Sequence, residues 1–255
     1  MDRTRQGNVS LEHNNGISTI TFYHPAHNSL PGNLLSQLTQ AIVEAGTHPE
    51  TKVVVLKSSG DRTFCAGASF DELSAIGNPE QGKHFFLGFA NVINAMRKCP
   101  KFIVGRVQGK AVGGGVGLAA AVDYCMATKW ASVKLSELAV GIGPFVVGPA
   151  VQRKIGLSAF SQMSINAKAW QTAAWAKEKG LFTEVFETAE QLDAYLEHFI
   201  ETLKTYNPEA MKKLKEIFWE GSENWDELLD KRAAVSGELV LSDFAKEAIA
   251  AFKGT

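Results

Sequence analysis

Cysteine is scarce in this sequence, which contains three, Cys65, Cys99 and Cys125. Their number is odd and no two are spaced as Cys-x-x-Cys, so we expect reduced, buried thiols instead of a disulfide framework or a zinc site. A nucleophilic role for Cys65 is the alternative to a small core residue, which is the favoured interpretation. His24 and His27 do not form a His-Glu-x-x-His pattern, so no metal site is predicted.

An excess of charge of either sign is also absent. The 26 Lys and Arg residues are balanced by 27 Asp and Glu residues, which gives a formal net charge of −1. Without a long basic block, the sequence carries no electrostatic signature of sequence-independent nucleic-acid binding or of docking to an anionic membrane. We therefore expect a neutral or locally recognised ligand and neither a nucleic-acid nor a membrane partner.

Hydrophobic runs long enough to cross a bilayer are missing as well. The uncharged stretch 138–152 is interrupted by Gly141, Gly143, Pro144, Gly148 and Pro149. The opening residues, MDRTRQGNVS, lack the apolar stretch of a signal peptide. These features predict a cytoplasmic protein.

The remaining composition is that of a globular protein, with 45% hydrophobic and 21% charged residues among 255. Residues 8–22 alternate apolar and polar positions across an Asn14-Asn15-Gly16 turn, which predicts a β-hairpin. Pro31 opens a predicted helix with apolar residues at helical spacing, which are Leu34, Leu35, Leu38, Ala41, Ile42 and Ala45. Apolar runs at 53–56, 102–104 and 124–126, separated by helical segments, predict a parallel α/β core. From about residue 188 the helical period continues to the C-terminal end, which predicts an all-helical region.

Three segments are candidates for chemistry, and the first is the run from Phe64 to Phe70. Its small residues allow a ligand to approach the backbone, and Ser69 is placed to cap a helix that starts near Asp71. Backbone amides would then point at an anion. A tight turn that needs small residues for packing is the alternative.

The second segment, Val107 to Leu118, leaves a predicted strand and enters a helix. It lacks the Gly-Lys-Ser/Thr of a P-loop and the third glycine of a dinucleotide fingerprint. What remains is a glycine-lined helix N-terminus, whose free N–H groups stabilise negative charge. Close packing of helices is the alternative explanation.

The third segment, Ser136 to Phe145, places one carboxylate in a run that is otherwise uncharged as far as Arg153. We expect Glu137 to be desolvated and its pKa to be raised, as a general acid/base near neutral pH requires. A solvated capping carboxylate is the alternative.

In order and spacing, these three segments resemble the crotonase family of enoyl-CoA hydratases and isomerases. Cys65-Ala66-Gly67-Ala68-Ser69 is similar to the family's AG(A/F)(D/x) segment, although Ser69 stands where Asp is common. The stretch from Gly109 to Leu118 is similar to its glycine-rich segment, and Ser136 to Gly141 to its Pro/Ser-Glu-x-x-x-Gly segment. The opening HPAHNSL is similar to its RPxxxNAL loop, so the resemblance extends over nearly the whole chain.

The resemblance implies an α/β spiral of ββα turns over residues 1–195 and a helical oligomerisation region over 196–255, assembled as a homotrimer or a dimer of trimers. It implies that the backbone N–H groups of Ala68 and Gly114 form an oxyanion hole for the thioester of an acyl-CoA. No cofactor is implied, because CoA enters as the carrier group of the substrate. The implied CoA contacts are Ala26, Ala66, Ser69 and Phe70, and the implied pocket residues are Gly117, Pro144 and Phe145.

Residue 117 departs from the family's hydratases, which carry a first catalytic glutamate where this chain has Gly117 and a second where it has Glu137. Adding water across a double bond is easier with two carboxylates, whereas one carboxylate is enough to move a proton along an allylic system. Isomerisation of a 3-enoyl-CoA to a 2-enoyl-CoA, with Glu137 as the single proton shuttle, is therefore the favoured activity. Against it, the segment from Gly141 to Val147 resembles methylglutaconyl-CoA hydratases. Hydration, decarboxylation of an acyl-CoA and non-catalytic acyl-CoA binding remain the alternatives, in that order.

Overall fold

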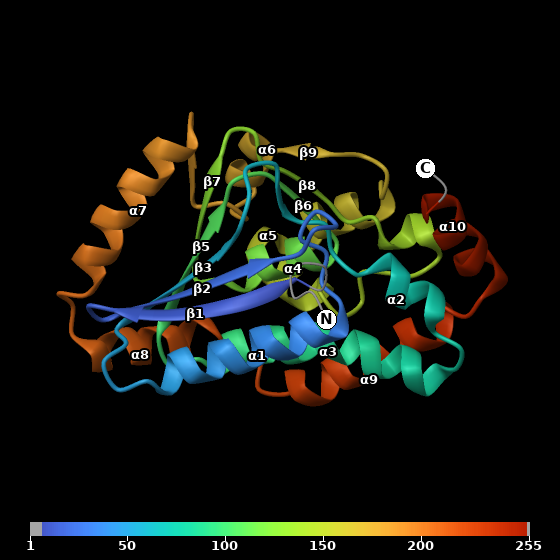
Figure 1. The fold of residues 1–255 in the computed structure, drawn as a ribbon, viewed down its shortest axis with the longest axis horizontal. Helices are drawn as coiled ribbons and strands as arrows, with labels where there is room; N and C mark the ends of the chain where they lie inside the picture. Colours follow the sequence, from blue (N-terminus) through green and yellow to red (C-terminus); the bar gives the residue numbers. More distant parts are fainter. Residues whose placement is uncertain (1–6, 254–255) are drawn as a thin grey trace.

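A six-stranded sheet forms the main body of the chain in the computed structural model, which describes residues 7–253 (Figure 1). Residues 1–6, part of the opening segment discussed above, lie outside the described residues. The strand order is β1-β2-β3-β5-β7-β10, antiparallel between β1 and β2 and parallel elsewhere. Its strands are β1 (Asn8–Asn14), β2 (Ile17–Tyr23), β3 (Val53–Ser58), β5 (Phe102–Val107), β7 (Tyr124–Thr128) and β10 (Glu184–Phe186).

The predicted hairpin and the three predicted core strands are confirmed. Asn15 and Gly16 between β1 and β2 both have positive φ, 47° and 79°, which matches the twist of a two-residue hairpin turn. The buried face of the helix that follows Pro31 is made of the six residues that the sequence pattern gave, together with Gly46. Local sequence was sufficient at these places, because the hairpin and the helix show their periods and the core strands show continuous apolar runs.

A second sheet of four short strands, in the order β4-β6-β8-β9, lies beside the first. Each of β3, β5 and β7 continues into one of its strands and then into helix, which is the ββα turn that the resemblance implied. Strands of two or three residues show no alternation, and the sequence analysis did not predict them. They are β4 (Thr63–Cys65), β6 (Lys110–Val112), β8 (Ser132–Lys134) and β9 (Gln171–Thr172).

Helices cover both faces of the large sheet. In Figure 1, α1, α3 and α9 lie along the lower side, α7 at the left, and α2 and α10 at the right. The helical elements are α1 (Gly32–Thr47), α2 (Phe70–Ala75), α3 (Pro79–Lys98), α4 (Gly114–Ala121), the 3₁₀ turn η1 (Glu137–Val140), α5 (Gly148–Ile165), α6 (Ala173–Glu178), α7 (Ala189–Leu203), α8 (Pro208–Phe218), α9 (Trp225–Leu239) and α10 (Asp243–Lys253). Val54 and Leu56 of β3 face the main core, whereas Val53 and Val55 face a second core under α7. Burial on both faces explains the unbroken apolar runs of the parallel strands.

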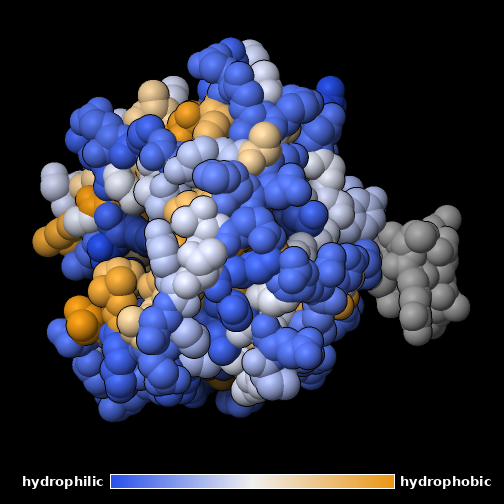
Figure 2. All heavy atoms as spheres, turned by 90° about the vertical axis from the view of Figure 1, so that its left-hand side faces the viewer, coloured by the Kyte–Doolittle hydropathy of each residue, from blue (hydrophilic) through white to orange (hydrophobic). Residues whose placement is uncertain are grey.

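The outer surface over α7 and α8 is mostly polar. Figure 2 shows this face as largely hydrophilic, with separate groups of hydrophobic residues. The predicted division at residues 195 and 196 falls inside α7, which is continuous there, so the division into two regions stays a prediction. Within residues 7–253, no helix has both the length and the apolar character needed to span a membrane.

The C-terminal helix α9 packs directly against α3. Helices α3 and α9 cross at Gly82 and Gly237, where a Cβ on Gly82 would lie 2.6 Å from the Cα of Gly237. Real side chains do not come that close, so the two backbones touch directly. This contact brings α9 against the part of α3 that faces the candidate site.

Candidate active site

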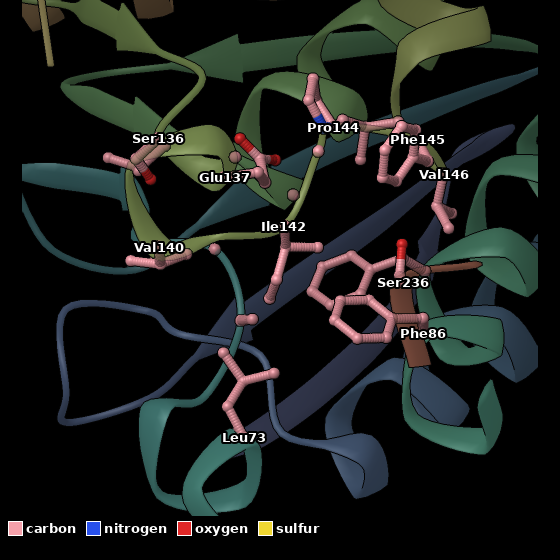
Figure 3. A pocket seen from close by; sticks show the side chains of 18 of the residues that line it. Leu73, Phe86, Ser136, Glu137, Val140, Ile142, Pro144, Phe145, Val146 and Ser236 are labelled. Carbon is pink, nitrogen blue, oxygen red and sulfur yellow. The ribbon is translucent and has the colours of Figure 1, made fainter. Parts of the chain in front are cut away.

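A narrow, mostly apolar cavity of ≈ 70 Å³ lies where the three candidate segments meet (Figure 3). The first segment contributes Ala66, Gly67, Ala68 and Phe70; the second contributes Val112, Gly113 and Gly114; the third contributes Ser136, Glu137, Val140, Ile142, Gly143, Pro144 and Phe145. Segments that are far apart in the sequence therefore build one site. Its location at the junction of several ββα turns is typical of small-molecule sites in α/β folds.

The backbone amides of Ala68 and Gly114 border the cavity from two touching loops. Gly67 has φ 87°, and its carbonyl accepts a 2.8 Å hydrogen bond from the N–H of Leu30, which fixes the loop. A Cβ at Gly67 would lie 3.5 Å from the nitrogen of Gly114, so the two loops are in contact. Gly114 is the first residue of α4, where N–H groups have no partner inside the helix and carry the positive end of its dipole. Among the described residues, neither amide donates a hydrogen bond outside regular elements.

Glu137 projects toward the same point from η1. A Cβ on Gly113 would lie 2.9 Å from Oε1 of Glu137, so the carboxyl group sits against the Gly113–Gly114 peptide. Oε2 is enclosed and has no hydrogen-bond partner among the described residues. This desolvation raises the pKa of Glu137 to about 7, against the lowering effect of a hydrogen bond from its own backbone. The raised pKa expected from the sequence is confirmed, and the alternative of a solvated cap is wrong.

Gly117, expected as a pocket residue, does not line the cavity. It lies within α4, and a Cβ there would come within 2.6 Å of Cγ1 of Val147. Val147 itself lines the cavity and fills the space that a side chain at position 117 would need. A glutamate side chain at position 117, where the resemblance implies one in hydratases, would therefore collide with Val147.

The remaining predicted contacts differ in where they lie. Ala66 and Phe70 line the cavity, whereas Ala26 is exposed and lies outside it. The loop that contains Ala26 is joined to the first segment, because the N–H of Ala66 donates a hydrogen bond to the carbonyl of His27. Ser69 is buried and also lies outside the lining. Its hydroxyl accepts a 3.4 Å hydrogen bond from the N–H of Glu72, which is the predicted helix cap of α2.

Cys65 is fully buried directly before the first segment. Burial raises the pKa of its thiol to about 12, so it stays protonated at neutral pH. Cys99 and Cys125 are buried and free as well, as expected for reduced thiols. The interpretation of Cys65 as a core residue is confirmed, and its buried, protonated thiol is unsuited to a nucleophilic role.

Some lining residues were missed by the sequence analysis. Leu73 of α2, Phe86 and Phe89 of α3 and Ser236 of α9 complete the wall opposite Glu137. Figure 3 shows Phe86 and Ser236 together near Phe145 and Val146. In the sequence the apolar members of this group are indistinguishable from other core-facing positions of amphipathic helices. Their place in the cavity depends on how α3 crosses α9.

A family model described as enoyl-CoA hydratase/isomerase matches residues 12–254, almost the whole chain. The chain belongs to the enoyl-CoA hydratase/isomerase family. The family and the enzyme class implied by the three segments are therefore confirmed. The fold is confirmed by comparison with an enoyl-CoA hydratase from Bacillus halodurans, whose crystal structure superposes with a TM-score of 0.88 over 95% of this chain and 99% of that one, at 20% identity.

Two relatives of similar sequence identity to this chain differ in their activity. The peroxisomal Delta(3,5)-Delta(2,4)-dienoyl-CoA isomerase of Arabidopsis thaliana is 25% identical over 244 residues, covering 89% of this chain and 86% of the relative. The short-chain-enoyl-CoA hydratase of Clostridium acetobutylicum is 27% identical over 248 residues, covering 96% and 94%. Because this isomerase and this hydratase are about equally similar to the chain in sequence, the reaction that the chain catalyses has to be inferred from its site.

Proposed function

We propose that this enzyme isomerises 3-enoyl-CoA thioesters to 2-enoyl-CoA thioesters, with Glu137 as the single proton carrier. The observation that supports it best is the composition of the cavity wall. Among the described residues that line the cavity, Glu137 is the sole ionisable side chain. Hydration needs a group to activate water and a group to handle the proton at C2, whereas isomerisation needs one group that does both of its proton transfers.

In the proposed reaction, ionised Glu137 removes a proton from C2, which lies between the thioester carbonyl and the C3–C4 double bond. The electron pair of the broken C–H bond moves into a dienolate, whose oxygen carries the negative charge. The N–H groups of Ala68 and Gly114 donate to this oxygen, and two such fixed donors lower the barrier strongly. Protonated Glu137 then returns the proton to C4, the electrons shift back, and the double bond lies between C2 and C3.

The surroundings of Glu137 suit both of these transfers. A carboxyl group with a pKa of about 7 is ionised and protonated in comparable amounts near neutral pH, so it can accept and return a proton without a large energetic penalty. The apolar wall of Val140, Ile142 and Val147 keeps competing water away from the dienolate. The predicted CoA contacts along Ala26, Ala66, Ser69 and Phe70, and the trimeric assembly, remain part of the proposal.

The decisive experiment supplies the purified enzyme with a 3-enoyl-CoA, a 2-enoyl-CoA or 3-methylglutaconyl-CoA in D₂O and follows products by mass spectrometry and NMR. A shifted double bond without added water supports the proposal. Addition of water would show that one glutamate suffices for hydration and would replace isomerase by hydratase. Absence of product and of deuterium uptake from all three would favour decarboxylation or a binding role.

The pH dependence gives a second test of Glu137 as the base. Because burial raises the pKa of Glu137 to about 7, we expect kcat/KM for the 3-enoyl-CoA to rise with pH and to level off above about 7. The rise in kcat/KM follows the fraction of free enzyme in which the carboxyl group of Glu137 is ionised. A profile that instead falls above pH 7 would mean that the protonated form starts the reaction, and would contradict the proposed role.

Phe145 limits the length of the acyl group in this proposal. Its ring folds over Gly143, where a Cβ would come within 2.4 Å of the ring, and the cavity is far below the roughly 300 Å³ at which ordinary ligand pockets begin. We expect Phe145→Ala to raise kcat/KM for 3-decenoyl-CoA relative to 3-pentenoyl-CoA by about ten-fold or more. Unchanged relative values, in a variant with unchanged melting temperature, would show that another residue sets the limit.

A further inference from the structure

Two lysines share one tryptophan ring beside the small sheet. The Nζ of Lys134 lies 4.5 Å and the Nζ of Lys110 5.3 Å from the ring centroid of Trp170. Lys110 begins β6, Lys134 ends β8, and Trp170 directly precedes β9. These three side chains form a lysine–tryptophan cluster, with the two lysines on paired strands and Trp170 directly before a third. The ring holds both ammonium groups in place by cation–π attraction.

The lysine–tryptophan cluster carries positive charge. Among the described residues, neither lysine forms an ion pair with a carboxylate. Burial lowers the pKa of Lys134, and the nearby charge of Lys110 lowers it further. A second lysine beside a tryptophan does have a carboxylate partner. The Nζ of Lys129 lies 4.9 Å from the ring centroid of Trp130 and also forms an ion pair with Glu187. Two mutually repelling ammonium groups held on one ring form a ready-made site for an anion.

The lysine–tryptophan cluster lies next to the cavity. Lys134 is paired in register with Val112, so their side chains lie on the same face of the small sheet, and Val112 lines the cavity. The carbonyl of Lys134 accepts a 2.9 Å hydrogen bond from the N–H of Gly113, which lies against Glu137. Beyond these positions, β6 leads into Gly114 and β8 leads into Ser136 at the cavity wall.

We propose that Lys110, Lys134 and Trp170 form a phosphate-binding site at the edge of the cavity. A phosphate group carries between one and two negative charges near neutral pH and offers several acceptor oxygens, which two ammonium groups can bind together. The identity of its carrier rests on the proposed function: with an acyl-CoA as substrate, the phosphate belongs to the nucleotide part of CoA. Free phosphate compounds share this chemistry, so the test separates the two sources.

The test measures dissociation constants by calorimetry for CoA, pantetheine and inorganic pyrophosphate. We compare the wild type with Lys110→Gln/Lys134→Gln and with Lys129→Gln, the matched lysine beside a tryptophan. We expect the double variant to bind CoA at least about ten-fold more weakly, while pantetheine, which has no phosphate, binds as before and Lys129→Gln matches the wild type. Glutamine keeps much of the aliphatic stem and removes a repulsion, so the melting temperature should not fall.

Each other result has a defined meaning. Weaker pyrophosphate binding with unchanged CoA binding would support the phosphate site and assign it to a carrier other than CoA. Unchanged binding of both CoA and pyrophosphate would overturn the proposal. If the wild type binds no CoA, the proposed function fails, while the pyrophosphate comparison still decides whether the site exists.

Discussion

Replacing Glu137 by glutamine is expected to lower kcat for isomerisation by about 10²–10⁴-fold while CoA still binds. Glutamine has nearly the same shape but cannot take up the C2 proton, and no other ionisable side chain is present among the described lining residues to replace it. The loss should appear in kcat with little change in the dissociation constant of CoA. Turnover that survives the substitution, in a variant that binds CoA normally, would contradict the proton-shuttle role.

A stability measurement shows whether Glu137→Gln folds correctly and whether the carboxyl group is buried as described. The pKa of Glu137 in the folded enzyme, about 7, lies above the 4.5 of an unperturbed glutamate. Between pH 4.5 and about pH 7, Glu137 is therefore protonated in the folded state and ionised in the unfolded state. The free energy of unfolding falls as the pH rises through this range. Glutamine lacks this dependence. We expect the variant to gain stability relative to the wild type between pH 5 and pH 8, measured by urea denaturation.

Gly67→Ala is expected to lower kcat by about 10²–10³-fold, the usual cost of losing one oxyanion-hole donor. Gly67 has φ 87°, a backbone conformation that is energetically unfavourable for alanine. The new Cβ would also lie 2.8 Å from the carbonyl oxygen of Val112. The loop has to shift, and it moves the N–H of Ala68 away from its position beside Gly114. The measurement is kcat with the 3-enoyl-CoA, together with the melting temperature.

Gly60 provides the matched control for this substitution. It has the same φ of 87°, but a Cβ there meets no atom within 4 Å. Gly60→Ala therefore carries a similar backbone strain without displacing a neighbouring segment, so a modest loss of stability and a nearly normal kcat are expected. Equal kcat values for Gly67→Ala and Gly60→Ala would show that the position of the Ala68 amide does not matter for turnover.

Much of the fold could be predicted because the deciding information is local. The helix α1 displays its period, the strands β3, β5 and β7 contain continuous apolar runs, and the Asn15-Gly16 turn sets the hairpin register. The strands of the small sheet are two or three residues long, and their existence depends on pairing between distant segments. No single stretch of sequence contains that information.

The candidate site was predictable to a similar extent. Glu137 could be identified from its uncharged surroundings, and the resemblance placed Ala68 and Gly114 beside it. The role of Val147 was not predictable, because its contact with Gly117 is made across two elements that share no sequence pattern. Ser236 was missed for the same reason, since one buried hydroxyl in an amphipathic helix carries no signal of its own.

The direct contact of α3 and α9 at Gly82 and Gly237 makes the cavity depend on a late part of the chain. A ribosome delivers the strands of both sheets, the glycine-rich segment and Glu137 before residues 225–239 exist. Until α9 has been made and has docked on α3, the cavity lacks the part of its wall that contains Ser236. A nascent chain that ends before residue 225 therefore has the sequence of both sheets and of Glu137 but cannot complete the cavity wall.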